Sequence, residues 1–332
     1  MTDFVPFNNV YEVIFEYSFD VINPKKVTFL GQKNKHRTCI FCRKSEPLIK
    51  FKNKAHVIPA AFGNRTLFSY QECDGCNLKA SSIENDISNY LTLTRSMARK
   101  RSRKGTVKYK PKGLESYICS GINNPDQVNI KLIAGENGVL FEKDENKKEI
   151  KVTIQRPPFN PTKVCKALAK MAFFVLDPNM QRVYDWIRKW LRSELYFLPS
   201  LYRGFIPGTG LIKTSLRVSK NKLLPSHLLV QFEFSTAVLF MYLPEKYLDL
   251  SFVHPQPSAP FPIRVFNLCK DEIVSGGLES YNISYAINSD EIKKEIGLLA
   301  NSYFEKRNYQ HGQDLNDWLK AEREVKNKYG IN

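Results

Sequence analysis

The spacing of apolar positions changes several times along the first half of the chain, and each change predicts a different element. From Val10 to Phe15 apolar and polar side chains alternate as in a strand. After Asn77 the apolar residues recur about every three to four positions as far as Leu91, which predicts an amphipathic helix. Alternation returns at 128–132 and 150–154, where we expect half-buried strands.

The second half repeats this mixture. Asn160-Pro161-Thr162 is a typical helix start, and apolar residues follow it at helical spacing from Val164 to Val175. Residues 181–195 predict another helix, and 228–234 and 238–243 predict strands. Four prolines within 255–262 indicate an extended loop. The pattern as a whole favours an α+β fold.

Composition narrows the class of protein. A chain of 332 residues with 42% hydrophobic residues is sized for two folded domains. No apolar run approaches the roughly 20 residues of a membrane span, and the first residues do not resemble a signal peptide. Seven cysteines, four of them in metal-type pairs, fit a reducing compartment. We therefore expect a cytoplasmic protein without a membrane partner.

Positive charge is concentrated toward the N-terminus. The net charge is +17, and the first 113 residues, with 21 Lys/Arg and 9 Asp/Glu, carry +12 of it. From Arg95 to Lys112 there are nine basic residues and no acidic one. A cationic region of this density attracts polyanions because bound phosphates release their counterions. Nucleic acid is the predicted partner, with DNA favoured over RNA.

The most specific motif is a double pair of cysteines. Cys39 and Cys42 form one Cys-x-x-Cys, and Cys73 and Cys76 form the other. Two tight turns that each present two thiolates satisfy the tetrahedral preference of Zn²⁺. We interpret the four cysteines as a structural zinc site. Two unrelated reduced pairs are the alternative.

Between the two pairs lies the run Ala55-His56-Val57-Ile58-Pro59, and Asn77 follows the second pair. In this arrangement residues 37–93 resemble the zinc-knuckled HNH endonucleases with the ββα-metal fold. The resemblance implies a hairpin that carries His56 as general base, a helix that carries a metal ligand, and a Mg²⁺ or Mn²⁺ ion between them. Histidine suits this role, since its ordinary pKa of about 6.5 lets it accept a proton near neutrality.

The other metal ligands follow the family pattern less closely. Asn77 matches the ligand position on the helix, but Ala55 replaces the acidic or histidine ligand that often precedes the base. Glu84, seven residues after Asn77 on the same helical face, is our candidate for the missing charge. Asn64 is the only asparagine between His56 and Cys73, and therefore the one candidate for the central Asn of the motif.

Basic residues after the predicted helix are expected to contact DNA phosphates without reading sequence. They are Arg95, Arg99, Lys100, Arg101, Arg103 and Lys104. A solvated basic face is the alternative. The tail, with Asp317-Trp318-Leu319 near its centre, is similar to a short bacterial domain of unknown function that implies a helical module.

Five segments are therefore predicted. A strand-rich segment (1–36) precedes the ββα-metal unit (37–93), a basic arm (94–113), an α+β accessory domain (114–285) and a helical module (290–332). The resemblance implies a metal-dependent DNA endonuclease, in a setting such as bacterial restriction or antiphage defence. A non-catalytic zinc-knuckle nucleic-acid-binding protein is the alternative. A homodimer, and a regulatory ligand or partner protein on the accessory domain, remain open.

Overall fold

The computed structural model describes residues 11–19, 26–33, 36–98, 101–102, 105–110, 115–120, 128–131, 139–144, 149–197, 199–205, 214–222, 226–247, 263–266, 273–274, 278–284, 289–307 and 313–329. The chain divides into two compact units. The first comprises Met1–Glu136 with Gln155–Gly277, and the second comprises Asn137–Ile154 with Leu278–Asn332. Both helices and strands are present, which confirms the predicted α+β class. None of the described helices is long and apolar enough to cross a bilayer.

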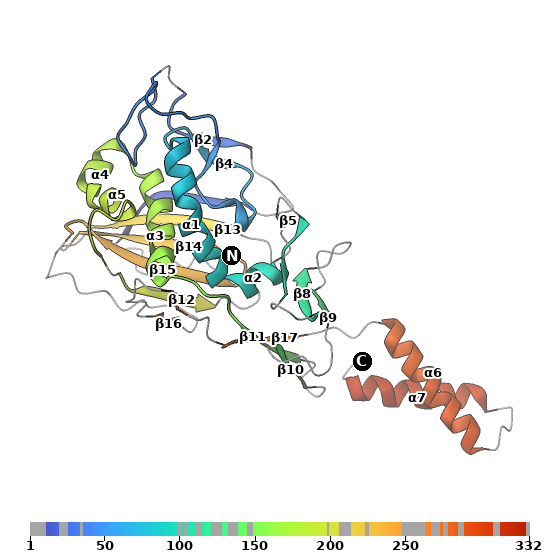
Figure 1. Ribbon diagram of the computed structural model, residues 1–332. Coiled ribbons are helices and arrows are strands. Elements are labelled where there is room, and N and C mark those ends of the chain that lie inside the picture. The colour runs from blue at the N-terminus through green and yellow to red at the C-terminus, as the bar shows by residue number, and fades with distance from the viewer. Residues whose placement is uncertain are drawn as a thin grey trace. The chain divides into compact units, whose positions relative to one another are not determined.

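A six-stranded antiparallel sheet forms the centre of the first unit (Figure 1). Its order is β1-β13-β14-β15-β12-β16. The strands are β1 (Tyr11–Phe19), β12 (Leu201–Phe205), β13 (Thr214–Asn221), β14 (His227–Phe234), β15 (Ala237–Pro244) and β16 (Ile263–Phe266). The predicted strands at 228–234 and 238–243 are confirmed as β14 and β15. They pair through a turn in which Ser235 has φ 55°.

Five described helices belong to the first unit, and one of them covers a face of this sheet. The five helices are α1 (Asp74–Tyr90), α2 (Thr92–Met97), α3 (Pro161–Val175), α4 (Pro178–Val183) and α5 (Asp185–Leu191). Helix α3 lies over β13, β14 and β15, and α1 lies beside it (Figure 1). The start of α3 follows the prediction, because the Asn160 side chain accepts from the Lys163 amide and Pro161 occupies the first turn. The helix predicted over 181–195 is broken at Tyr184 into α4 and α5.

A second, smaller sheet carries the residues between the two cysteine pairs. It has the order β2-β4-β3, with β2 (Thr28–Leu30), β3 (Ala55–His56) and β4 (Leu67–Ser69). The 3-10 helix η1 (Ala60–Phe62) joins β3 to β4. Strand β3 runs antiparallel to β4, and β2 runs parallel to it. Gly31 ends β2 with φ 76°, where an added Cβ would come within 2.5 Å of the Gln71 side chain.

The remaining described elements are short. The first unit has β5 (Arg101–Ser102) paired with β6 (Gly105–Thr106), and a sheet of β7 (Lys108–Tyr109), β8 (Tyr117–Ser120) and β9 (Val128–Lys131). The second unit has a sheet of β10 (Val139–Asp144), β11 (Glu149–Gln155) and β17 (Leu278–Ser284), and the helices α6 (Ser289–Lys306) and α7 (Asp314–Tyr329). The helical tail is confirmed. The predicted loop at 255–262 lies outside the described residues.

The compact units differ from the predicted segments. Strand β1, predicted to belong to a separate N-terminal segment, is an edge of the central sheet, and β2 extends the small sheet. Part of the predicted basic arm is ordered as the end of α2, the β5–β6 pair and β7. Strands β10 and β11 group with β17 and the tail rather than with the rest of 114–285. These assignments depend on pairings between distant strands, which local periodicity does not encode.

One core joins the small sheet to the central sheet. The Phe62 ring lies 5.1 Å from that of Phe232 and 4.9 Å from that of Phe234, both on β14. On the other side, Phe41 packs 5.8 Å from Phe173 and 5.1 Å from Phe174 on α3. All six side chains belong to one buried cluster. The predicted ββα-metal unit is therefore an integral part of the first compact unit.

Candidate metal centre and active site

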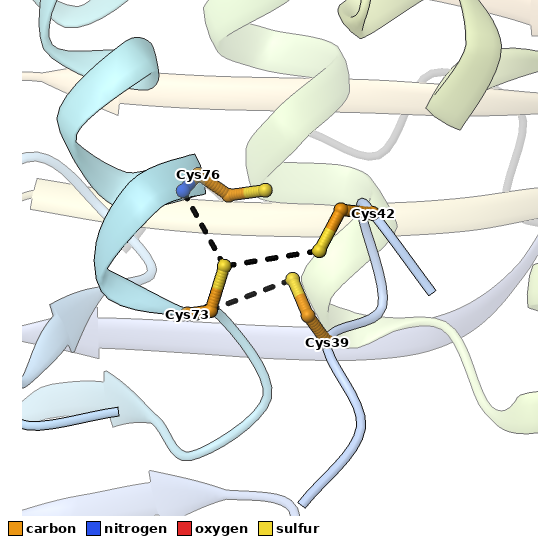
Figure 2. A group of neighbouring side chains, drawn as sticks. All are labelled: Cys39, Cys42, Cys73 and Cys76. Carbon is orange, nitrogen blue, oxygen red and sulfur yellow. Dashed lines mark hydrogen bonds between the residues drawn. The ribbon is translucent and has the colours of Figure 1, made fainter. Parts of the chain in front are cut away.

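The four motif cysteines converge at the N-terminus of α1 (Figure 2). Cys39 and Cys42 come from a tight turn in which Arg43 has φ 59°, and Cys73 and Cys76 flank the start of the helix. Their sulfur atoms all lie within 4.8 Å of one another, and those of Cys42 and Cys73 are 3.8 Å apart. Tetrahedral zinc with bonds of about 2.3 Å places neighbouring sulfurs about 3.8 Å apart. The geometry therefore fits a four-thiolate zinc site.

Backbone amides prepare this site for negative charge. The Cys76 amide donates to the Cys73 sulfur at 3.4 Å, so that Cys73 is both a candidate ligand and the N-cap of α1. The Cys73 amide donates to the Cys39 sulfur at 3.5 Å. A hydrogen bond from the Cys76 thiol lowers the pKa of Cys39 to about 5. Burial raises the pKa of Cys73 to about 11. Four thiols this close ionise together only when a cation offsets their charge.

His56 lies on the small sheet opposite Phe68. The two residues face each other in the β3–β4 register, and their ring centroids are 4.8 Å apart. The His56 side chain is half-buried, while Ala55 is completely buried on the opposite face. Alternation along β3 therefore separates the two positions, with the candidate base toward the surface and the alanine in the core.

Asn64 ties the loop between β3 and β4 together. Its fully buried amide nitrogen donates to the carbonyls of Ile58 and Leu67, both at 2.7 Å. Its oxygen accepts from the amides of Thr66 and Leu67 at 3.1 and 2.9 Å. Because these bonds close the loop on both sides, Asn64 positions the strand that carries His56. Its place as the only asparagine in the loop was the available sequence signal.

The structure gives Glu84 a partner that the sequence did not indicate. Its carboxylate accepts from Lys170 Nζ at 2.8 Å, and the same nitrogen lies 3.2 Å from Glu72. Lys170 and Glu72 are almost completely buried. Burial lowers the pKa of Lys170, but the charges of Glu72 and Glu84 outweigh it and hold the pKa above its ordinary value. Glu84 thus neutralises a buried lysine, which argues against its predicted role as a metal ligand.

Asn77 and the predicted DNA contacts differ in their surroundings. Asn77 is half-buried in the first turns of α1, and its side chain has no hydrogen-bond partner among the described residues. Arg95 instead points inward and donates to the carbonyls of Ala61 and Ser88 at 3.3 and 3.2 Å. Burial lowers the pKa of its guanidinium. These bonds give Arg95 a structural role and argue against its predicted contact with phosphate.

The other predicted phosphate contacts are not placed by the structure. Arg99, Lys100, Arg103 and Lys104 lie outside the described residues, and Arg101 is described only as backbone in β5. Among the described residues, the four cysteines are also the one group of three or more Cys, His, Asp or Glu side chains close enough to share an ion.

Comparisons with known proteins agree with the motif. Residues 39–91 match a family model described as HNH endonuclease, and residues 293–327 match a family described as a protein of unknown function. The first match contains both cysteine pairs and His56, and the second begins in α6 and ends in α7. Both resemblances seen in the sequence are confirmed. Neither the curated proteins nor the solved structures include a match to the chain.

Proposed function

We propose that this chain is a metal-dependent HNH endonuclease that hydrolyses DNA phosphodiester bonds, with His56 as general base. The observation that carries the proposal is the arrangement around β3. His56 is directed away from the core, Asn64 holds its loop, and the cysteine cluster fastens the preceding turn to the start of α1. This arrangement coincides with the segment that matches the HNH endonuclease model.

His56 would remove a proton from the water that attacks the scissile phosphorus. A Mg²⁺ or Mn²⁺ ion, when bound, would offset charge on the phosphate and the leaving oxygen. Asn77 is the residue we propose as its protein ligand, since its amide has no competing partner among the described residues. Mg²⁺ fills the rest of its shell with water and phosphate oxygens. With Ala55 at one position and Glu84 paired with Lys170, we expect the ion to bind mainly together with the nucleic acid.

The test is cleavage and binding by the full chain with His56→Ala. The matched control is His36→Ala, because His36 is an exposed histidine just before the first cysteine pair. Loss of general base catalysis typically costs 10²–10⁴-fold in rate. We expect a loss of about that size for His56→Ala in Mg²⁺-dependent plasmid cleavage, unchanged DNA binding, and normal cleavage by His36→Ala. A His56→Ala protein that cuts at the wild-type rate would refute the assignment.

A non-catalytic nucleic-acid-binding protein is the second candidate. Two observations favour it, namely the buried Ala55 at the usual ligand position and the ion pair that occupies Glu84. It would be supported if wild type and His56→Ala bind equally and neither cuts DNA or RNA with Mg²⁺ or Mn²⁺. Offering both polymers to one preparation also separates a DNA nuclease from an RNA nuclease. A role in restriction or antiphage defence remains a prediction.

A further inference from the structure

The outer face of the small sheet carries a row of four rings. Phe29 is in register with Phe68, and Phe68 is in register with His56, so these side chains share a face. Tyr70, two residues beyond Phe68, points the same way. The ring centroids of Tyr70 and Phe29 are 4.4 Å apart with planes at 9°, and those of Phe29 and Phe68 are 5.4 Å apart. The row therefore runs from Tyr70 to the candidate base, and we call it the aromatic row.

Three of the four rings in the aromatic row, those of Phe29, Tyr70 and His56, are only half-buried. The buried residues Ala55, Leu67 and Ser69 occupy the opposite face of the sheet and fasten it to the first unit. Phe68, at the centre of the row, is buried, and the other rings lie around it on the same face. Phe29 and Tyr70 therefore leave part of their rings accessible to a ligand on this face.

Cations surround the aromatic row. Lys54 Nζ lies 5.9 Å from the Phe29 ring centroid and 6.0 Å from that of Phe68. Beside the rings is a hollow of about 240 Å³, lined in part by Phe29, Tyr70, Lys33, Lys52 and Lys54. Glu72 also lines it, and this buried carboxylate is paired with Lys170. The three lysines are exposed, and no carboxylate among the described residues pairs with them. This chemistry is complementary to flat apolar rings joined by phosphates.

We propose that the aromatic row and these lysines bind a single strand of nucleic acid and lead it to His56. Bases would stack on Tyr70 and Phe29 while phosphates contact the lysines, as on other single-strand surfaces. A duplex cannot use the rings in this way, because its bases already stack on one another. The inference rests on the proposed function for its catalytic consequence, and it names the substrate as single-stranded or locally unpaired.

Binding is measured with the full chain carrying His56→Ala, so that cleavage does not interfere. The probes are a labelled 20-nucleotide DNA strand, the RNA strand of the same sequence and the corresponding DNA duplex. Phe29→Leu and Tyr70→Leu remove the rings and keep apolar volume. Stacking on one aromatic side chain contributes roughly 5- to 150-fold in affinity. We expect each variant to weaken single-strand binding at least fivefold without affecting the duplex.

The contribution of the lysines is tested by the salt dependence of binding. Lys54→Gln should lower the slope of log affinity against log salt by about 0.7, the value for one phosphate contact on a single strand. The ring variants should leave that slope unchanged. Tyr196→Leu and Lys189→Gln are the matched controls, because both side chains are exposed away from the small sheet. Neither control should change the affinity or its salt dependence.

Phe29→Trp guards against a folding artefact, because it keeps a ring at the same position. The fluorescence of the added tryptophan is obtained by subtracting the signal of the parent protein. Single strands should quench it, and the duplex should not. Tighter binding to the duplex, or ring variants that bind single strands like the parent, would overturn the inference. If binding depends on the rings but the protein with His56 does not cleave nucleic acid, the single-strand inference stands and the proposed nuclease function is rejected. If the protein cleaves nucleic acid and the ring variants bind single strands like the parent, the nuclease function stands and the single-strand inference is rejected.

Discussion

At the scale of single residues, Asn64 holds the loop between β3 and β4 through four side-chain hydrogen bonds. Replacing it with alanine would remove the Asn64 hydrogen bonds to the Ile58 carbonyl and to the Thr66 and Leu67 amides. The Leu67 carbonyl would keep only its bond from the Val57 amide. Each unsatisfied group of this kind costs about 1–3 kcal/mol. We expect Asn64→Ala to lower the free energy of unfolding by about 3 kcal/mol or more in chemical denaturation. Asn53→Ala, at an exposed position, is the control, and a pair of identical denaturation curves would contradict the prediction.

Variants at Lys170 and Glu84 test whether Glu84 is the ion-pair partner of the buried lysine or a metal ligand. Lys170→Met would leave Glu72 and Glu84 without their cation, and breaking a buried pair costs about 3–5 kcal/mol. Lys163→Met, a more exposed lysine on the same helix, should cost much less. Glu84→Gln should weaken the fold by about 1 kcal/mol and leave cleavage intact. A variant with wild-type stability and no cleavage would restore Glu84 as a metal ligand.

At the scale of elements, the cysteine cluster connects the start of α1 to the turn that carries Cys39 and Cys42. The first turn of the helix is capped by Cys73 itself, so a zinc ion would hold the knuckle turn and the helix together. Binding free energy at such sites is folding free energy. We expect a zinc-selective chelator to unfold residues 37–93, seen as new proteolytic cleavage there and reduced helical circular dichroism.

Two controls accompany the zinc prediction. Cys39→Ser should reproduce the effect of the chelator, whereas Cys165→Ala, at a buried cysteine of α3, should leave zinc content unchanged. Removal of Mg²⁺ alone should stop cleavage and leave the fold intact. Equal damage to the fold from both treatments would contradict the division between a structural and a catalytic ion.

At the scale of the whole molecule, the segment with the motif depends on the central sheet. Phe62 inserts against β14, and the Thr214 hydroxyl donates to the Phe62 carbonyl at 3.4 Å. A fragment of residues 26–98 would expose this side chain and Phe41 to water. We expect the zinc-loaded fragment to lack a cooperative thermal transition and to bind a hydrophobic dye. A sharp, zinc-dependent unfolding transition of the fragment alone would show that it folds independently.

The sequence by itself determined the elements whose signal is local. Cys39 and Cys42 identify the knuckle because two thiolates at that spacing meet one ion, and α3 follows from its capping residues and apolar stripe. The interpretation of His56 came from its neighbours in the motif. In each case the signal is a fixed spacing along the chain, short for the capping residues and the paired cysteines and about fifty residues for the whole motif.

Tertiary structure alone decided what depends on distant pairings. Lys170 meets Glu84 across 86 residues, and the rings of Phe29 and Tyr70 stack only because β2 pairs with β4. The register that brings such groups together is set by the packing of whole elements, and the short-range periodicity of the sequence does not predict it. The lysine bond to Glu84 and the aromatic row beside His56 therefore became visible only in the folded chain.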